Sequence, residues 1–461
     1  MNPTLFSRRH VLQQASAGFG FLAFAGLANL QAADEAKKQP PLAPKSPHFR
    51  ARAKRVIFLC MQGGPSHVDS FDYKPNLIRD HGKRGKYGGS LLKSPWAFRQ
   101  RGQSGLWISD LFPHVAEHAD KLTLIRSMQC DVPVHPGAMT QMHTGTAQFI
   151  RPSLGAWTLY GLGTENESLP GFVSLSPPSG TSRNYGSSFL PAIYGGSKVG
   201  NASRGGRGAR SNSGESVPDI KNPSLSPQQQ RTQLELIQAL NREKIRRDKV
   251  QPGVEGVIES YELAFRMQDA MPALMDTAKE TKETLAMYGA DGGPSENFGR
   301  QCLLARRFVE AGVRFVEVTQ GGWDQHTNLT VDHKSRAEAC DRAIAGLLQD
   351  LQQRDMLKDT LVIWGGEFGR TPAAQGGDGR NHNNRGYTSW MAGGGVKGGF
   401  SYGATDEHGY EAIEKKCHIH DWHATILHLL GLDHTKLTYR YAGRDFRLTD
   451  VHGNIAKDII S

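Results

Sequence analysis

The chain has 461 residues, a formal net charge of +10, 38% hydrophobic residues and 53 glycines, as is typical of a soluble, loop-rich enzyme. Its basic segments lack interleaved aromatic residues, which argues against a nucleic-acid-binding module. The positive excess favours anionic substrates such as phosphate or sulfate esters and polyanionic glycans, while a contribution to solubility alone remains the alternative.

Residues 1–33 are predicted to be an export signal. Residues 7–12 (SRRHVL) form a twin-arginine pattern, a glycine-interrupted apolar run follows at 15–30, and Ala32 and Ala33 supply small residues for cleavage. The run is shorter than the ~18 unbroken apolar residues that a spanning helix requires, although an uncleaved N-terminal anchor remains the alternative. We therefore expect export by the twin-arginine route to the periplasm or the extracellular space, with no membrane span in the mature chain.

The rest of the chain is predicted to comprise a proline-rich linker at 34–53 and one α/β domain at 54–461. Buried strands are expected at 55–61, 122–126, 315–318 and 360–364, and helices at 227–249, 261–288, 297–311 and 333–353. This alternation predicts a mostly parallel central sheet flanked by helices on both faces. The segment 195–216 is expected to be a flexible loop, and 227–290 a helical insertion.

Polar residues follow several of the expected strands directly, and in parallel sheets ligands collect beyond the carboxyl ends of the strands. Asp324 and His326 flank a single residue after the third strand, as two ligands of one divalent ion can. Glu367 follows the fourth strand, and His382 precedes an apolar run. Each of these residues alone is more often structural than catalytic, but together they predict a metal site.

Three further residues are candidates at neighbouring strand ends. His67 and Asp69 follow the first strand and can serve as ligands, the alternative being a surface histidine and a loop-capping aspartate. His135 begins a short helix that is expected to end at 144–145, and a helix N-terminus suits a phosphate or sulfate group.

The cysteines and the C-terminal histidines are expected to be structural. The five cysteines show no CxxC spacing, so a zinc–thiolate site is not expected; buried inert thiols, with at most one disulfide, are. A final helix is expected at 421–430 with Asp421 as its N-cap. His420, His423 and His428 are interpreted as structural residues of this helix.

Motifs along the chain resemble those of the domain of unknown function 1501 family, which is placed in the alkaline-phosphatase-like superfamily with the sulfatases. The motifs, besides the twin-arginine start, are GGPSHVD at 63–69, residues 135–145, GWDQH at 322–326, GEFGRTP at 366–372 and HDWHAT at 420–425. The resemblance covers nearly the whole chain after the signal and implies an alkaline-phosphatase-like α/β fold.

The superfamily's site residues transfer only in part. His135 falls where the resemblance implies a serine, threonine or formylglycine nucleophile, and Gln62 falls where it implies an aspartate ligand. Glu367 keeps a carboxylate where an Asp-His pair is usual. The resemblance thus implies that one metal site, formed by Asp324, His326 and His382, is retained. The second metal site is depleted unless Glu367, His67 and Asp69 rebuild it.

The leading hypothesis is hydrolysis of a phosphate or sulfate ester with one or two divalent ions, such as zinc, calcium or manganese. His135 would act as a ligand, general base or nucleophile, and Arg370 would pair with the anionic group of an ester or a sulfated or phosphorylated glycan. The rival hypothesis is a non-catalytic envelope protein of the same fold that binds anionic glycans. The sequence leaves the metal, the choice between phosphate and sulfate, and the oligomeric state open.

Overall fold

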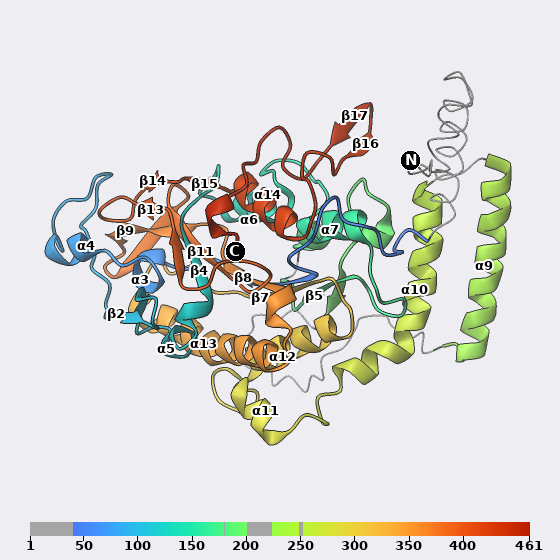
Figure 1. Ribbon diagram of the computed structural model, residues 1–461, viewed down its shortest axis with the longest axis horizontal. Coiled ribbons are helices and arrows are strands. Elements are labelled where there is room, and N and C mark those ends of the chain that lie inside the picture. Colours follow the sequence, from blue (N-terminus) through green and yellow to red (C-terminus); the bar gives the residue numbers. More distant parts are fainter. Residues whose placement is uncertain (1–39, 179, 201–223, 249–251) are drawn as a thin grey trace, which may run out of the picture.

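A computed structural model describes residues 40–178, 180–200, 224–248 and 252–461 (Figure 1). The expected export signal, residues 34–39 of the linker and residues 201–216 of the expected loop lie outside the described residues. The rest of the linker, residues 40–53, contains neither helix nor strand but packs on the domain: the Lys45 backbone N–H donates to Leu162 O at 2.9 Å. In the described ranges, no helix combines the length and apolarity needed to cross a bilayer.

The domain is built on a nine-stranded sheet in which β11 alone runs against the other strands. In spatial order the main path is β12 (Phe400–Tyr402), β4 (Leu122–Gln129), β11 (Tyr387–Ala392), β8 (Thr360–Gly365), β1 (Arg55–Met61), β7 (Phe315–Gln320), β5 (Phe172–Leu175) and β6 (Ser197–Val199). The ninth strand, β15 (Cys417–His418), pairs with β4. The sheet is therefore mixed and mostly parallel.

The four strands expected from the sequence are β1, β4, β7 and β8. In β1, Val56 to Met61 are all buried, because β7 and β8 flank this strand and helices cover both faces of the sheet. Leu59 pairs with Val318 of β7 on one side and with Trp364 of β8 on the other. Strands β4 and β7 continue three and two residues beyond the expected ends, toward the edge where the polar segments follow.

Helices form a layer on each face of the sheet (Figure 1). On one face lie α12 (Glu296–Glu310) and α13 (Leu329–Gln353). On the other lie α6 (His135–Thr144), α7 (Leu154–Leu162) and α14 (Ile419–Leu429). This is the α/β architecture that the alternation of strands and helices predicts.

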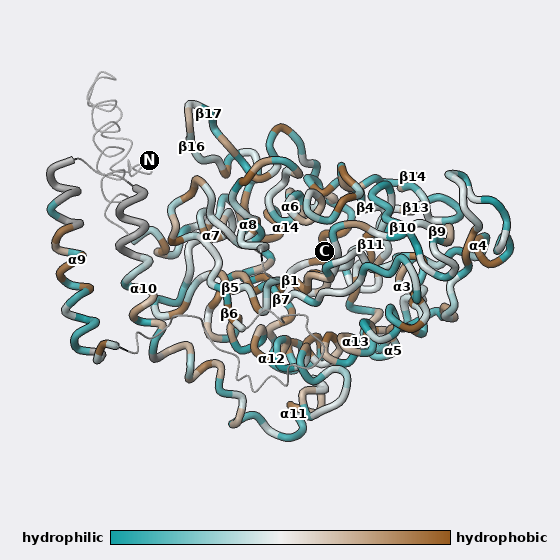
Figure 2. Tube along the Cα trace, turned by 180° about the vertical axis from the view of Figure 1, so that it is seen from behind, coloured by the Kyte–Doolittle hydropathy of each residue, from teal (hydrophilic) through white to brown (hydrophobic). Residues whose placement is uncertain are grey.

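A pair of long helices projects from one end of the domain, as both overall views show (Figures 1 and 2). These are α9 (Pro227–Asp248) and α10 (Pro252–Met275), and a short α11 (Lys282–Met287) follows. The prediction of a single helix at 261–288 is therefore wrong. Helix α11 is a separate helix because the Thr281 side chain caps its start by accepting from the Thr284 N–H.

Smaller elements complete the fold. The short helices are α3 (His67–Ser70), α4 (Pro75–Arg79), α5 (Pro113–Ala116), α8 (Ser182–Tyr185) and four 3₁₀ turns at Ala119–Lys121, Ala192–Tyr194, Leu357–Asp359 and Lys457–Ile459. The two-stranded ladders are β2 (Phe98–Arg101) with β3 (Leu106–Ser109), β9 (Gly369–Gln375) with β10 (Gly379–Asn383), β13 (Ala404–Thr405) with β14 (Ala412–Glu414), and β16 (Tyr439–Tyr441) with β17 (Arg444–Phe446).

The start of α14 differs from the sequence prediction by three residues. His418 is the N-cap, and its ring accepts from the His420 N–H, while the Asp421 carboxylate accepts from the His418 N–H at 3.0 Å. Asp421 therefore closes a capping box from the third helical position. The five cysteines, all described, are free and buried, so the expectation of inert thiols is met without a disulfide.

A buried ion pair joins the loop after β1 to the β9–β10 ladder. Arg380 donates to both carboxylate oxygens of Asp69, at 2.6 and 3.0 Å, and neither side chain is exposed to solvent. The remaining Arg380 donors reach the carbonyls of Thr371, Pro372 and Leu92. Burial of Asp69 opposes ionisation, but the charge and hydrogen bonds of Arg380 outweigh it and lower the pKa of the carboxyl.

Removing Asp69 should destabilise the fold strongly, because Asp69→Ala leaves the Arg380 guanidinium buried without its counter-charge. We expect a loss of about 3–5 kcal/mol in the free energy of unfolding, measured by urea denaturation. The control is Glu338→Ala, which removes an exposed pair with Lys334 and should cost less than about 1 kcal/mol. Similar losses of unfolding free energy in both variants would show that the buried Asp69–Arg380 pair is no more important for stability than an exposed pair.

Candidate metal centre

The polar segments after β1, β4, β7 and β8 meet at one edge of the sheet. Because these four strands run in the same direction, their carboxyl ends share that edge. The segments after β7 and β8 carry Asp324 and Glu367, and the segment after β4 leads into His135 at the first position of α6. His382 comes from β10, whose ladder with β9 places it opposite Arg370.

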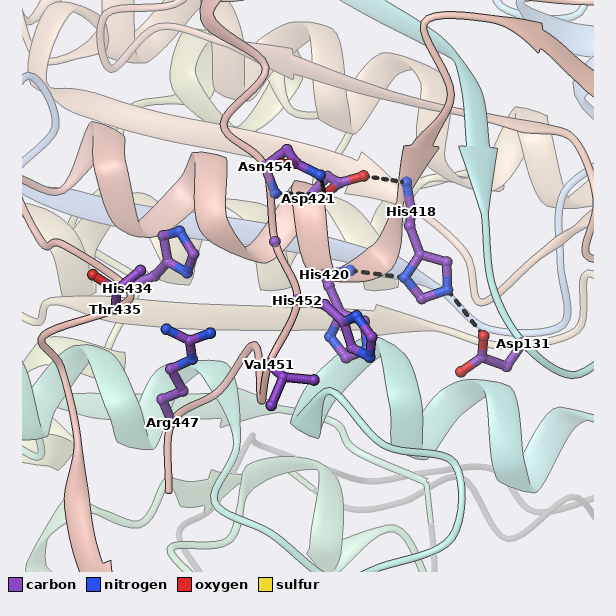
Figure 3. A pocket seen from close by; sticks show the side chains of 11 residues that line it. Asp131, His418, His420, Asp421, His434, Thr435, Arg447, Val451, His452 and Asn454 are labelled. Carbon is purple, nitrogen blue, oxygen red and sulfur yellow. Dashed lines mark hydrogen bonds and ion pairs between the residues drawn. The ribbon is translucent and has the colours of Figure 1, made fainter. Parts of the chain in front are cut away.

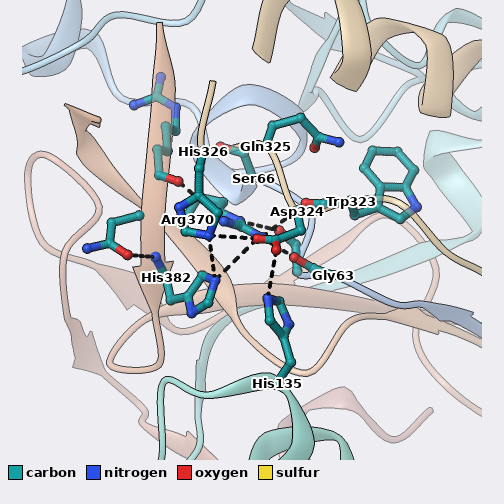
Figure 4. A network of polar contacts seen from close by, with 12 residues as sticks. Gly63, Ser66, His135, Trp323, Asp324, Gln325, His326, Arg370 and His382 are labelled. Carbon is teal, nitrogen blue, oxygen red and sulfur yellow. Dashed lines mark hydrogen bonds and ion pairs between the residues drawn. The ribbon is translucent and has the colours of Figure 1, made fainter. Parts of the chain in front are cut away.

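Three histidines surround one carboxylate at this edge (Figure 4). The Nε2 atoms of His326 and His382 lie 2.9 and 3.2 Å from Asp324 Oδ1, and His135 Nε2 lies 3.2 Å from Asp324 Oδ2. One ligand atom from each of the four residues fits within 4.8 Å of all the others. The structure therefore brings together Asp324, His326 and His382, as expected, and adds His135 to them.

Each of the three imidazoles is held from behind through Nδ1. In His382, Nδ1 must carry the proton, because its partner at 2.7 Å is the backbone carbonyl of Pro133, which can only accept. His135 Nδ1 lies 2.6 Å from Glu367 Oε1, and His326 Nδ1 lies 2.7 Å from Gln375 Oε1. In neutral rings of this tautomer, Nε2 has no proton and presents a lone pair to Asp324.

This arrangement fits a bound cation. His326 Nε2 and His382 Nε2 are 3.0 Å apart, and at that distance either a proton on His326 or a cation shared by the two nitrogens must separate their lone pairs. His135 Nε2 has no hydrogen-bond partner. Backbone carbonyls and carboxylates on the far ring nitrogens are the usual second-shell partners of metal-bound histidines. Three imidazole nitrogens and one carboxylate form a donor set that suits zinc better than calcium.

Glu367 lies behind the cluster and has no solvent exposure. Its carboxylate accepts from the Gly63 N–H at 3.0 and 3.1 Å and from His135. Gly63 has φ +115°, and a Cβ there would lie 2.7 Å from the backbone nitrogen of Trp323. Only glycine at this position lets the loop after β1 pass close to Trp323 while donating to Glu367.

Arg370 orients Asp324 from the protein side. Its side chain is fully buried and donates to Asp324 Oδ1 at 2.6 Å, to Gly64 O at 2.9 Å and to Trp323 O at 3.2 Å. It donates as well to the carbonyls of Gly63 and Arg380. The sequence predicts that Arg370 pairs with the anionic group of a substrate. In the structure its side chain has no exposed surface and fixes the Asp324 carboxylate instead.

The pKa values of two histidines of the cluster, His135 and His382, are shifted in opposite directions. Burial would lower the pKa of His135, but the hydrogen bond and charge of Glu367, followed by Asp324, outweigh burial and raise it. For His382 burial lowers the pKa, Arg370 lowers it further, and the bond to Pro133 opposes the change. Burial also opposes ionisation of Asp324, yet Arg370 keeps the pKa of that carboxyl well below its usual range.

His67 and Asp69 are not part of the cluster. Asp69 forms an ion pair with Arg380. His67 is buried, and its Nε2 lies 2.8 Å from the Gly409 carbonyl oxygen. Nor does Glu367 contribute to the four-residue group directly, since it acts through His135. The sequence could not separate these roles, because the chain order places each of these residues after a strand end in the same way.

A second group of metal-binding residue types lies under α6 in the interior. Cys60, His143 and Glu317 are fully or almost fully buried, and His143 Nε2 lies 3.3 Å from Glu317 Oε1. Burial lowers the pKa of His143, but the charge and hydrogen bond of Glu317 raise it overall. The His143–Glu317 contact is a buried ion pair between α6 and β7. Neither residue was predicted from the sequence to belong to a site.

The chain belongs to the family described as "Protein of unknown function (DUF1501)", whose model matches residues 53–460. Among curated proteins no match was found. Solved structures with distant similarity include Ps i-CgsB in complex with k-i-k-neocarrahexaose, with 12% identity, a TM-score of 0.38, and coverage of 82% of this chain and 72% of that one.

Two further structures are similar at the same distant level. The PsFucS1 sulfatase from Pseudoalteromonas sp. has 12% identity, a TM-score of 0.35, and coverage of 83% of this chain and 68% of that one. The alkaline phosphatase from the Antarctic bacterium TAB5 has 13% identity, a TM-score of 0.29, and coverage of 76% and 93%.

We expect the protein to lose bound metal when the ligands of this centre are removed. Asp324→Ala and His382→Ala should each lower the zinc content of the purified protein by at least tenfold, measured by inductively coupled plasma mass spectrometry after dialysis. His114→Ala, which removes an exposed histidine outside the cluster, is the control and should change nothing. Metal content equal to that of the unaltered protein in both ligand variants would refute the site.

Glu367 should act on the protonation of His135. Glu367→Gln keeps the shape of the side chain but removes the negative charge behind the ring, so the pKa of His135 should fall, measured by NMR pH titration of the metal-free protein. Glu338→Gln serves as the exposed control. An unchanged pKa of His135 in Glu367→Gln would show that Glu367 does not hold this ring.

Proposed function

We propose that the protein is an exported, metal-dependent hydrolase of phosphate or sulfate esters. The observation that carries this proposal is the set of three histidines whose Nδ1 atoms are held from behind while their Nε2 atoms face Asp324. A site of this kind serves no evident purpose in stability, because it concentrates polar atoms at the edge of the sheet. Such sites are typical of metal-assisted hydrolysis.

Asp324, His326 and His382 would hold the divalent ion, and zinc suits this donor set best. When bound, the ion supplies Lewis-acid polarisation of the ester and a more acidic water. Arg370 holds the Asp324 carboxylate in place by a buried bond of 2.6 Å. The Pro133 carbonyl and the Gln375 side chain fix the two imidazole rings in their orientations.

His135 would accept the proton of the attacking water at Nε2. Its Nδ1 is bonded to the buried carboxylate of Glu367, which stabilises the imidazolium that forms, as the orienting acid does in other acid–base pairs. The cluster consists of three imidazoles and a carboxylate, and His135 occupies the position at which the family resemblance implies the nucleophile. A direct attack by water therefore fits the site better than a covalent intermediate on a side chain.

The substrate would carry an anionic ester group. His135 begins α6, a ten-residue helix whose first turn contains no acidic residue, so its N-terminal N–H groups favour a negative charge near the cluster. The net charge of +10 acts in the same direction over longer distances. The twin-arginine pattern at 7–12 supports export to the periplasm or the extracellular space, where phosphorylated or sulfated glycans are accessible substrates.

A non-catalytic protein that binds anionic glycans through the same centre is the second candidate. The observation in its favour is that His135 occupies the position at which the family resemblance implies a hydroxyl or formylglycine nucleophile. The two candidates differ in turnover, which a substrate panel measures directly.

Hydrolysis should depend on the metal and on His135. After removal of residues 1–33, the protein would be stripped with a chelator, reloaded with zinc, manganese or calcium, and assayed on aryl phosphates, bis-aryl phosphodiesters and aryl sulfates. We expect turnover of at least one class that returns only with metal and disappears in Asp324→Ala. His135→Gln should retain metal and lose about 10²–10⁴-fold in kcat.

The outcomes separate the alternatives. Metal binding without turnover of any substrate class would favour the non-catalytic candidate. Loss of metal in His135→Gln would make His135 a fourth ligand instead of the base. His114→Ala is again the matched control and should leave kcat unchanged.

A further inference from the structure

A separate pocket of about 550 Å³ opens beside the N-terminus of α14 (Figure 3). It is formed by the loop after β4, the start of α14 and the C-terminal segments around 434 and 447–454. Its polar lining includes Asp131, His418, His420, Asp421, His434, Thr435, Arg447, His452 and Asn454. A pocket of this volume accommodates a sugar-sized ligand.

Both acidic residues of the pocket have hydrogen-bond partners in the protein. Asp131 accepts from His418 Nε2 at 3.0 Å and from the Gln141 amide, although its side chain is 59% exposed. Asp421 accepts from the backbone N–H groups of His418 and Asn454 in the capping of α14. Asp421 is therefore held by the capping of the helix, and Asp131 lies at the exposed rim of the pocket.

The basic residues, by contrast, keep free donor capacity. Arg447 uses Nε on the Asp450 carbonyl, and among the described residues no carboxylate forms an ion pair with its guanidinium. His420 is 6% exposed, yet its Nδ1 has no hydrogen-bond partner. His452 is exposed and stacks on His420, with ring centroids 5.0 Å apart.

Two histidines of the pocket have lowered pKa values. Burial, followed by the neighbouring His418 and His452, lowers the pKa of His420 to about 4, against the opposing charges of Asp131 and Asp421. Burial and then Arg447 lower the pKa of His434, which also lines the pocket and bonds to Thr449. Both imidazoles are therefore neutral at pH 7, and the Arg447 guanidinium is the fixed positive charge that an anion in the pocket would meet.

We propose that this pocket binds a tetrahedral oxyanion, phosphate or sulfate, carried by a sugar-sized molecule. The planar fork of Arg447 would take the oxyanion, with His420, His434 and His452 as further donors around it. Thr435 and Asn454 are uncharged polar residues of the same wall and suit hydroxyl groups.

A metal ion fits the pocket less well than an anion does. Among the described residues, the groups of ligand atoms close enough to share an ion are the metal centre and the interior Cys60–His143–Glu317 group, and neither includes a pocket histidine. His418 has both ring nitrogens engaged, with Asp131 and with the His420 N–H. A cation would also meet the positive charge of the Arg447 guanidinium.

The pocket and the metal centre share one short segment. Asp131 lines the pocket, Pro133 holds His382 in the metal centre, and His135 belongs to that centre. An anion in the pocket is therefore positioned to affect the same loop that orients two residues of the cluster. The proposal concerns binding in this pocket and does not depend on the hydrolase activity.

The test uses the full protein without residues 1–33, carrying Asp324→Ala so that no anion bound through a metal ion contributes to the signal. Binding of galactose 6-sulfate, inorganic sulfate and inorganic phosphate would be measured by isothermal titration calorimetry at constant ionic strength, with galactose as the uncharged probe. We expect saturable binding of the anions and no binding of galactose. Arg447→Gln should weaken anion binding by about 10–100-fold.

Two further variants control for folding and for general charge. His452→Gln changes an exposed residue and should weaken binding at least threefold even if Arg447→Gln proves unstable. Arg440→Gln removes an exposed arginine of the nearby β16–β17 ladder, where it pairs with Asp445, and should leave binding unchanged. Equal affinity in the Arg447, His452 and Arg440 variants would overturn the proposal.

Other results would overturn it as well. Anion binding that is present in the unaltered protein but absent in the Asp324→Ala background would place the anion at the metal centre. Zinc binding in that background, lost in His452→Gln and unaccompanied by anion binding, would make the pocket a metal site.

Discussion

The proton positions of three imidazoles control the chemistry at the sheet edge. His135, His326 and His382 are each held through Nδ1 by an acceptor behind the ring, which leaves the three Nε2 atoms directed at Asp324. Two of these Nε2 atoms lie 3.0 Å apart, so a proton or a cation must lie between them. The surrounding structure therefore holds the three rings in an arrangement that suits a bound cation.

The supporting residues are buried and come from separate strand ends. Glu367 follows β8, and it is fixed by the N–H of Gly63, which follows β1. Arg370 is the second residue of β9 and donates to three carbonyls of the loops after β1 and β7 while it holds Asp324. Because each contact crosses between loops of different strands, the site is rigid only when the whole sheet is formed. This explains how a site on loops can be preorganised.

The oxyanion pocket and the metal centre divide the polar surface at this end of the molecule into two kinds of site. The metal centre presents imidazole nitrogens and a carboxylate, and the pocket presents the Arg447 guanidinium and several imidazoles. The segment 131–135 belongs to both.

The sequence by itself determined the strands β1, β4, β7 and β8, the helices α9, α12 and α13, and the pairing of Asp324 with His326, because these depend on local periodicity and on short spacing. It did not determine which polar residues meet. His67 and Asp69 follow a strand end just as Asp324 does, yet the fold turns them toward Gly409 and Arg380. His420, which looked structural, lines a pocket that only the packing of α14 against residues 434–454 creates. Such roles depend on contacts between residues hundreds of positions apart, and only the tertiary structure decides them.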